Sequence, residues 1–139
     1  MKIYLAAQYH LKADIAAKAA QLEELGHEVS STWHKEDIPA GAGLEAATDK
    51  TWAEYAQRDL DEIFSSNMFI VFTVDPNTPT RRGGRHVETG FALSRPSIIC
   101  AIVGLRENIF HYLPWVKQFD TWEGALECLT SKRPTETAS

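Results

Sequence analysis

The sequence lacks the features that mark secreted, membrane and nucleic-acid-binding proteins. Its 2 cysteines, Cys100 and Cys128, lie in an apolar and a helical pattern without metal-ligand spacing, so we expect neither a disulfide nor a metal site. No apolar stretch approaches the ~20 residues that span a bilayer. The formal net charge of −5 argues against an extended basic face for nucleic-acid polymers. We therefore expect a cytoplasmic protein that binds small molecules without a cofactor.

Apolar runs and helical patterns alternate along the chain. Strand-like runs occupy residues 3–7, 27–33, 68–74, 98–103 and 116–119, and helical patterns occupy 12–25, 48–65, 85–94 and 121–129, with a helical turn at 108–113. This alternation predicts a doubly wound, flavodoxin- or Rossmann-like parallel sheet of about five strands with helices on both faces. We assign residues 1–130 to a single domain and 131–139 to a disordered polar tail.

Ligands of such sheets bind beyond the carboxyl ends of the strands, where the strand order reverses. Gln8, Tyr9 and His10 follow the first strand, and Trp33 ends the second. We take Gln8, His10 and Trp33 as candidate ligand contacts. For His10 a plain surface position fits equally well, and Trp33 could either stack on a planar ligand such as a base or cap the core.

Asp59 is the first of two carboxylates that stand out. It falls within the apolar stripe that Trp52, Ala56 and Ile63 form along the helix at 48–65. A buried, unpaired charge there would be costly, so Asp59 is either satisfied by Arg58 or a backbone amide, or belongs to a site. We favour the site.

Glu88 is the second carboxylate. It follows Gly83, Gly84 and Arg85 at the start of the helix at 85–94, and we expect it in the first turn. Two glycines permit close approach of the backbone to a ligand, and a helix N-terminus favours anions. A functional Glu88 and a Glu88 stabilised only by the helix dipole fit the spacing equally well. The arginines around the glycines, Arg82 among them, would attract an anion in a protein that is acidic overall.

Three segments together form a recognisable set: Lys2-Ile3-Tyr4-Leu5-Ala6-Ala7, Arg58-Asp59-Leu60, and Gly84-Arg85-His86-Val87-Glu88-Thr89-Gly90-Phe91-Ala92-Leu93. Over roughly residues 1–129 the chain resembles the nucleoside 2-deoxyribosyltransferase family, which also contains deoxynucleoside 5'-monophosphate N-hydrolases. The glutamate of that family's Gly-x-x-Glu-x-Gly-x-Ala pattern is its nucleophile. The pattern around Glu88 is the most specific of the three.

The resemblance implies a role for each matching residue. Glu88 would be the nucleophile, Asp59 would contact the sugar or assist protonation of the leaving base, and Tyr9 would orient the nucleophile or the ribose. Such an enzyme cleaves the N-glycosidic bond of a 2'-deoxynucleoside or its 5'-monophosphate through a covalent deoxyribosyl-Glu intermediate. The sugar then passes to another base in a transferase, or to water in an N-hydrolase.

One position departs from the family pattern. Six residues before the nucleophile, where transferases carry an aspartate for the 5'-hydroxyl and nucleotide hydrolases a serine for the 5'-phosphate, this chain has Arg82. An arginine suits a phosphate better than a hydroxyl. Substrate contacts by Arg82, Gly83, Gly84 and Arg85 would therefore favour a nucleotide.

The resemblance also implies a homodimer or higher homo-oligomer with shared sites. Phe110, Tyr112 and Trp115 would supply apolar surface for that interface.

Two other functions fit parts of the sequence. A lysine-decarboxylase-like nucleotide phosphoribohydrolase carries Gly-Gly-x-Gly-Thr-x-x-Glu before a helix, but Arg85 and His86 stand here in place of Gly-Thr. A non-catalytic nucleotide sensor could share the fold. The presence of both Asp59 and Glu88 argues against the sensor, because binding alone needs no pair of carboxylates.

Overall fold

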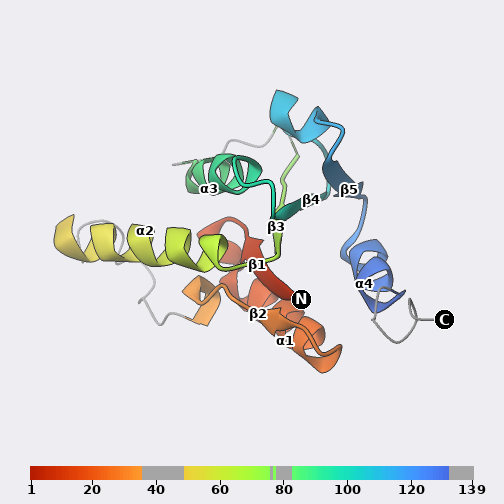
Figure 1. Cartoon of the computed structure of the whole chain (residues 1–139), viewed down its shortest axis with the longest axis horizontal. Helices are drawn as coiled ribbons and strands as arrows, with labels where there is room; N and C mark the ends of the chain where they lie inside the picture. The colour runs from red at the N-terminus through yellow and green to blue at the C-terminus, as the bar shows by residue number, and fades with distance from the viewer. Residues whose placement is uncertain (36–48, 76, 78–82, 132–139) are drawn as a thin grey trace.

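The computed structural model of the chain describes residues 1–35, 49–75, 77 and 83–131 (Figure 1). Its strands are β1 (Lys2–Ala6), β2 (Glu28–Val29), β3 (Met68–Phe72), β4 (Ile99–Val103) and β5 (Val116–Phe119). They form one parallel sheet in the order β2-β1-β3-β4-β5. This is the strand order of flavodoxin-like sheets, so the fold expected from the alternating pattern is confirmed.

Helices cover both faces of the sheet. They are α1 (Lys12–Glu24), α2 (Asp49–Phe64), α3 (Gly84–Leu93) and α4 (Trp122–Ser131), with short 3-10 helices η1 (Tyr9–Leu11), η2 (Trp33–Lys35) and η4 (Ile109–Tyr112). Helices α2 and α3 lie on one side of the sheet, and α1 and α4 lie on the other (Figure 1). Within the described ranges, no helix is long and apolar enough to cross a membrane.

The central strands hold the core. All five residues of β3 are buried, which explains why its sequence is continuously apolar rather than alternating. The rings of Tyr4 on β1 and Phe69 on β3 stack with their centroids 5.7 Å apart. The ring of Tyr4 thus packs in the core, and its hydroxyl is available for a hydrogen bond.

The second strand is shorter than the sequence predicts. Only Glu28–Val29 pair with β1, whereas we expected a strand over 27–33. The hydroxyl of Ser31 accepts the backbone N–H of Leu5 at 3.2 Å, so a side chain replaces the next backbone contact of the ladder. The chain then turns into η2, and Trp33 belongs to that helix instead of a strand.

The start of α3 also differs from expectation. Gly83 caps the helix in the left-handed conformation, with φ +65°, and the helix begins at Gly84. Glu88 is therefore in the second turn, beyond the free amides that stabilise an anion at a helix N-terminus. Ser131 ends α4, and the rest of the expected tail, 132–139, lies outside the described residues, as do 36–48.

Candidate active site

A hydrogen bond between β1 and α3 lies at the centre of the site. The hydroxyl of Tyr4 donates to Oε2 of Glu88 at 2.6 Å, across 84 positions of sequence. Burial raises the pKa of Glu88 to about 7, and the hydrogen bond from Tyr4 opposes that rise only in part. Burial and the negative charge of Glu88 also raise the pKa of Tyr4 far above its ordinary value. Tyr4 therefore keeps its proton, and Glu88 is the group that titrates near neutral pH.

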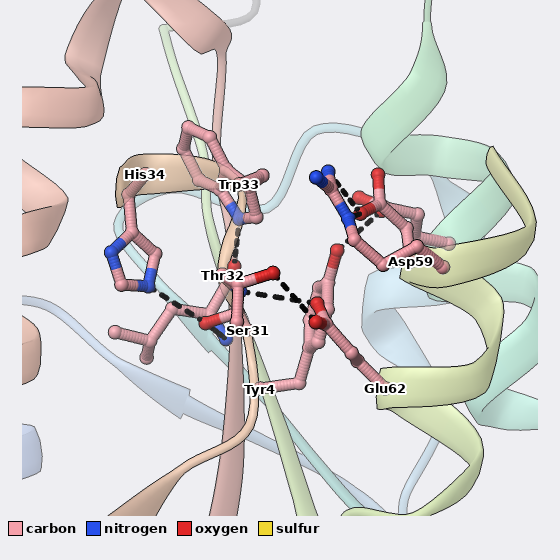
Figure 2. Close-up of polar contacts among 10 residues, drawn as sticks. Tyr4, Ser31, Thr32, Trp33, His34, Asp59 and Glu62 are labelled. Atoms are coloured by element: carbon pink, nitrogen blue, oxygen red, sulfur yellow. Dashed lines mark hydrogen bonds and ion pairs between the residues drawn. The ribbon is translucent and has the colours of Figure 1, made fainter. Parts of the chain in front are cut away.

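Asp59 lies close enough to this pair to act on it. Its charge raises the pKa of Glu88 and that of Tyr4. Its Oδ1 accepts hydrogen bonds from Nε and Nη2 of Arg58 at 3.1 and 2.9 Å. Of the alternatives for Asp59, the pairing with Arg58 is therefore present, and a role in the site stays a prediction. Figure 2 shows Tyr4 and Asp59 converging between the strands and α2.

A third carboxylate, Glu62, was missed by the sequence analysis. Its two oxygens accept the backbone N–H of Thr32 at 3.1 Å and the Thr32 hydroxyl at 2.6 Å (Figure 2). Its charge also raises the pKa of Glu88. Glu62 lies three residues after Asp59 on α2, a spacing that puts both side chains on one helix face and that could have identified it.

An open depression of about 440 Å³ lies along the same helix. Its volume is in the range of small-molecule sites. It is lined by Glu54, Gln57, Arg58, Asp61, Glu62 and Ser65. Because neither Tyr4 nor Glu88 lines it, it lies beside the hydrogen-bonded pair and not over it.

The residues that follow β1 lie outside the hydrogen bond to Glu88. Tyr9 was expected to orient the nucleophile or the ribose; among the described residues the hydroxyl bonded to Glu88 is that of Tyr4, and a contact of Tyr9 with the ribose stays a prediction. Tyr9 is 43% exposed, and its ring lies 6.1 Å from that of Trp33. His10 is exposed, and Gln8 is half-buried, with its carbonyl accepting the N–H of Leu11. Tyr4 could not be singled out from the sequence because it stands in an apolar run as a core tyrosine would.

Trp33 takes the role of a core residue. It is 7% exposed, and its indole N–H donates to the carbonyl of Leu5 at 2.7 Å. A base could stack on this ring only if the side chain left that position. Of the two alternatives for Trp33, capping of the core describes its contacts better.

Arg85 is committed to an ion pair. Its guanidinium forms two hydrogen bonds with the carboxylate of Glu107, one of them 2.8 Å long, and the two side chains are 4% and 7% exposed. We expected Arg85 to contact the substrate, but its charge is neutralised inside the protein. Gly83 caps the helix and is half-buried, Gly84 begins it and is exposed, and Arg82 lies outside the described residues.

The described residues contain no group of three or more His, Cys, Asp or Glu side chains arranged to hold a metal ion. The chemistry that the site can perform with its own groups is that of carboxylates. Glu88 is partly buried, its pKa is raised to about 7 because its ionised form is poorly solvated, and the phenol of Tyr4 orients it. Such a carboxylate can attack an electrophilic carbon.

Neither a scan against models of protein families nor a search of curated proteins finds a match to this chain. Solved structures do match it. A CMP N-glycosidase from Clostridium botulinum, BcmB, is 21% identical with a TM-score of 0.54, covering 93% of this chain and 98% of that one. A 2-deoxyribosyltransferase from Bacillus psychrosaccharolyticus is 19% identical with a TM-score of 0.67, covering 91% of this chain and 90% of that one. The chain shares their fold.

A third structure, of a conserved protein from Enterococcus faecalis, is 14% identical with a TM-score of 0.57 and covers 96% of this chain and 99% of that one. The resemblance to deoxyribosyltransferases seen in the motifs is therefore met again in the fold, over almost the whole chain. What these proteins share with the chain is the arrangement of strands and helices that positions Tyr4, Asp59 and Glu88.

Proposed function

We propose that this protein cleaves the N-glycosidic bond of 2'-deoxynucleosides or their 5'-monophosphates, with Glu88 as nucleophile. The observation that carries the proposal is the partly buried Tyr4–Glu88 hydrogen bond, with the charge of Asp59 acting on it. Two carboxylates around a buried reaction centre are what glycosidic chemistry needs. The fold shared with a CMP N-glycosidase and a 2-deoxyribosyltransferase supports it.

In the proposed first step, an oxygen of Glu88 bonds to C1' of the sugar while the bond from C1' to the base nitrogen breaks. The electron pair of that bond goes to the base, which takes up a proton from water, and Asp59, paired with Arg58, contacts the sugar. The negative charge of Glu88 stabilises the positive character that develops on the sugar. In the second step another base or water attacks C1' and gives up a proton to solvent, the bond from C1' to Glu88 breaks, and the carboxylate is regenerated.

The start of α3 is the proposed place for the 5' end of the substrate. Gly83 and Gly84 allow close approach, and the first amides of the ten-residue helix point toward an anion there. Arg85 is held by Glu107, which leaves Arg81 and Arg82 beside the glycines, and Arg82, six residues before Glu88, is the proposed 5'-phosphate contact. This favours 5'-monophosphates over free nucleosides.

Exposed apolar side chains support the homo-oligomer. Phe110, Tyr112 and Trp115 are 56%, 68% and 62% exposed, all within one stretch between β4 and β5. Large exposed aromatic residues that are close together are typical of protein interfaces. We propose that they contact a second copy of the chain.

The test is a panel of a deoxynucleoside, its 5'-monophosphate and CMP, each with and without an acceptor base, with release of free base as the readout. We expect activity on at least one deoxy substrate, and a loss of at least ~10³ in rate in Glu88→Ala with the fold kept. Glu127→Ala removes an exposed carboxylate from α4 on the other side of the sheet and serves as the matched control. Wild-type turnover in Glu88→Ala would contradict the covalent mechanism. Activity on CMP alone would mean that the protein acts on ribose and not on deoxyribose.

A further inference from the structure

Helix α3, which carries Glu88, is held at its two ends by different kinds of contact. Phe91, Ala92 and Leu93 pack against the core, and all three lie in the last turn. In the first turn the buried residue is Arg85. Apolar packing therefore holds the C-terminal end of α3, whereas the position of its first turn depends on what Arg85 binds.

The partner of Arg85, Glu107, joins three segments of the chain. The guanidinium of Arg85 donates two hydrogen bonds to its carboxylate, and the two side chains are 4% and 7% exposed. The same carboxylate accepts the backbone N–H of Val74, just beyond β3, at 3.2 Å. Because Glu107 itself follows β4, one side chain ties the first turn of α3 to the ends of two central strands.

The backbone of Glu107 is fixed as well. Its N–H donates to Nδ1 of His111 at 3.0 Å, and His111 is 1% exposed. The side chain of Asn108 accepts the N–H of Phe110 at 2.9 Å and caps η4. The carboxylate thus extends from a segment that is itself held in place, and it can serve as a rigid support for α3.

This support fixes direction as well as distance. Two hydrogen bonds between a guanidinium and a carboxylate define their relative orientation, which a contact between apolar side chains does not. Arg85 and Glu88 lie within one turn of the same helix, so a shift of the first turn also moves Glu88. The bond from Tyr4 to Glu88 is 2.6 Å long and allows little displacement.

We propose that Glu107 is a positioning residue of the proposed reaction, which holds Arg85 so that Glu88 meets the hydroxyl of Tyr4 and the sugar carbon at bonding distance. Its influence passes through α3, without contact with the substrate. This role rests on the proposed function, in which Glu88 attacks C1'.

The double variant Glu107→Leu with Arg85→Met separates positioning from stability, because apolar side chains can fill the same space without leaving a charge unpaired. We expect a urea midpoint close to that of wild type. We also expect kcat on the best substrate of the panel to fall by at least ~tenfold, since a small displacement of a reacting group is costly. A pair that serves stability alone predicts that activity returns with the midpoint.

The hydroxyl proton of Tyr4 gives a second readout that needs no substrate. Its NMR signal lies far downfield when the phenol bonds to a carboxylate at 2.6 Å, and its loss in Tyr4→Phe assigns it. We would record it at pH 8, above the pKa of Glu88. In the double variant the signal should move upfield, because the bond between Tyr4 and Glu88 lengthens.

The matched control is the same pair of changes at another ion pair, Asp14→Leu with Lys18→Met. Asp14 and Lys18 lie on α1, on the other side of the sheet (Figure 1). Both kcat and the Tyr4 signal should stay as in wild type. If the double variant at Glu107 does not regain the wild-type midpoint, Glu107→Gln replaces it, since its amide oxygen can accept the N–H of Val74 but cannot pair as a charge with Arg85.

A kcat within about twofold of wild type, or an unmoved Tyr4 signal, would overturn the proposal, as would equal changes in the control. The two proposals can fail separately. If Glu88→Ala retains full activity while the Tyr4 signal moves in the Glu107 variant, the glycosidic function falls and the support of α3 by Glu107 stands. If Glu88→Ala is inactive while the Glu107 variant keeps wild-type kcat and signal, the function stands and the role of Glu107 falls.

Discussion

Glu88 and Glu107 are two partly buried glutamates whose pKa values shift in opposite directions. Glu88 accepts a hydrogen bond from the phenol of Tyr4, and burial raises its pKa to about 7. Burial would also raise the pKa of Glu107, but the hydrogen bonds and positive charge of Arg85 bring it below its ordinary value. Arg85 lies only three residues before Glu88 on α3, so one helix contributes to both environments.

The opposite pKa shifts indicate which of the two carboxylates has a structural role. A full opposite charge satisfies Glu107, which fixes α3 to the segment after β4 and leaves no reactivity near neutral pH. A neutral phenol orients Glu88 without neutralising it, so its negative charge stays available for chemistry. Burial by itself does not distinguish the two residues, whereas the charge of the partner does.

The largest expected effect comes from breaking the ion pair. Glu107→Ala leaves the guanidinium of Arg85 buried without its partner, and we expect a loss of about 3–5 kcal/mol in the free energy of unfolding. Urea unfolding at neutral pH measures it. The double variant Glu107→Leu with Arg85→Met removes both charges and should recover much of the loss. A change below about 1 kcal/mol in Glu107→Ala would contradict a structural role for the pair.

The next effect concerns Glu88 and depends on pH. Because its pKa in the folded protein is about 7 against an ordinary value of 4.5, the folded state binds the proton more tightly than the unfolded chain does. Its contribution to stability is thus present at low pH and lost as pH rises through that window, by up to about 3 kcal/mol. Glu88→Gln does not titrate, so it should be more stable than wild type at pH 8, with a much smaller difference at pH 5. An equal difference at both pH values in urea unfolding would disprove the raised pKa.

A smaller effect follows from the engagement of Arg85 by Glu107. If Arg82 holds the 5'-phosphate, Arg82→Ala should lower kcat/KM for a monophosphate by about tenfold to a hundredfold and spare the nucleoside. Arg81→Ala, the neighbouring arginine, is the control. If the wild-type protein prefers free nucleosides, the proposed contact between Arg82 and a 5'-phosphate is wrong, and a transferase is favoured over a nucleotide hydrolase.

The smallest effect is expected from Tyr4→Phe. The hydroxyl lowers the pKa of Glu88, so its loss should raise that pKa and move the acid limb of activity to higher pH. At pH 7 this amounts to about a tenfold loss of rate. Tyr9→Phe, the control, should leave the limb in place. A shifted limb in Tyr9→Phe but not in Tyr4→Phe would restore the role first expected of Tyr9.

The sequence predicts the fold well because strand and helix periods are local properties. The buried run of β3 and the order of elements are enough to indicate a parallel sheet. The early end of β2 was not predictable, since it depends on the hydroxyl of Ser31 meeting Leu5 from another strand.

In the candidate site, too, some residues could be predicted from the sequence and others could not. Glu88 and Asp59 stand out by motif and by helical face. Tyr4 resembles any core tyrosine until its hydroxyl meets α3, and the partner of Arg85 is 22 positions away in the sequence. Contacts of α3 with segments distant in the sequence decide both roles, and no local pattern carries that information.

The hydrogen bond that joins β1 to α3 has a consequence for how activity arises during folding. Tyr4 precedes its partner by 84 positions in the sequence, and we expect β1 to pair with β3 before the two can meet. Contacts of such high contact order form late, after long loops have closed. In refolding, recovery of activity should therefore coincide with completion of the sheet, and a helical intermediate that precedes it should be inactive.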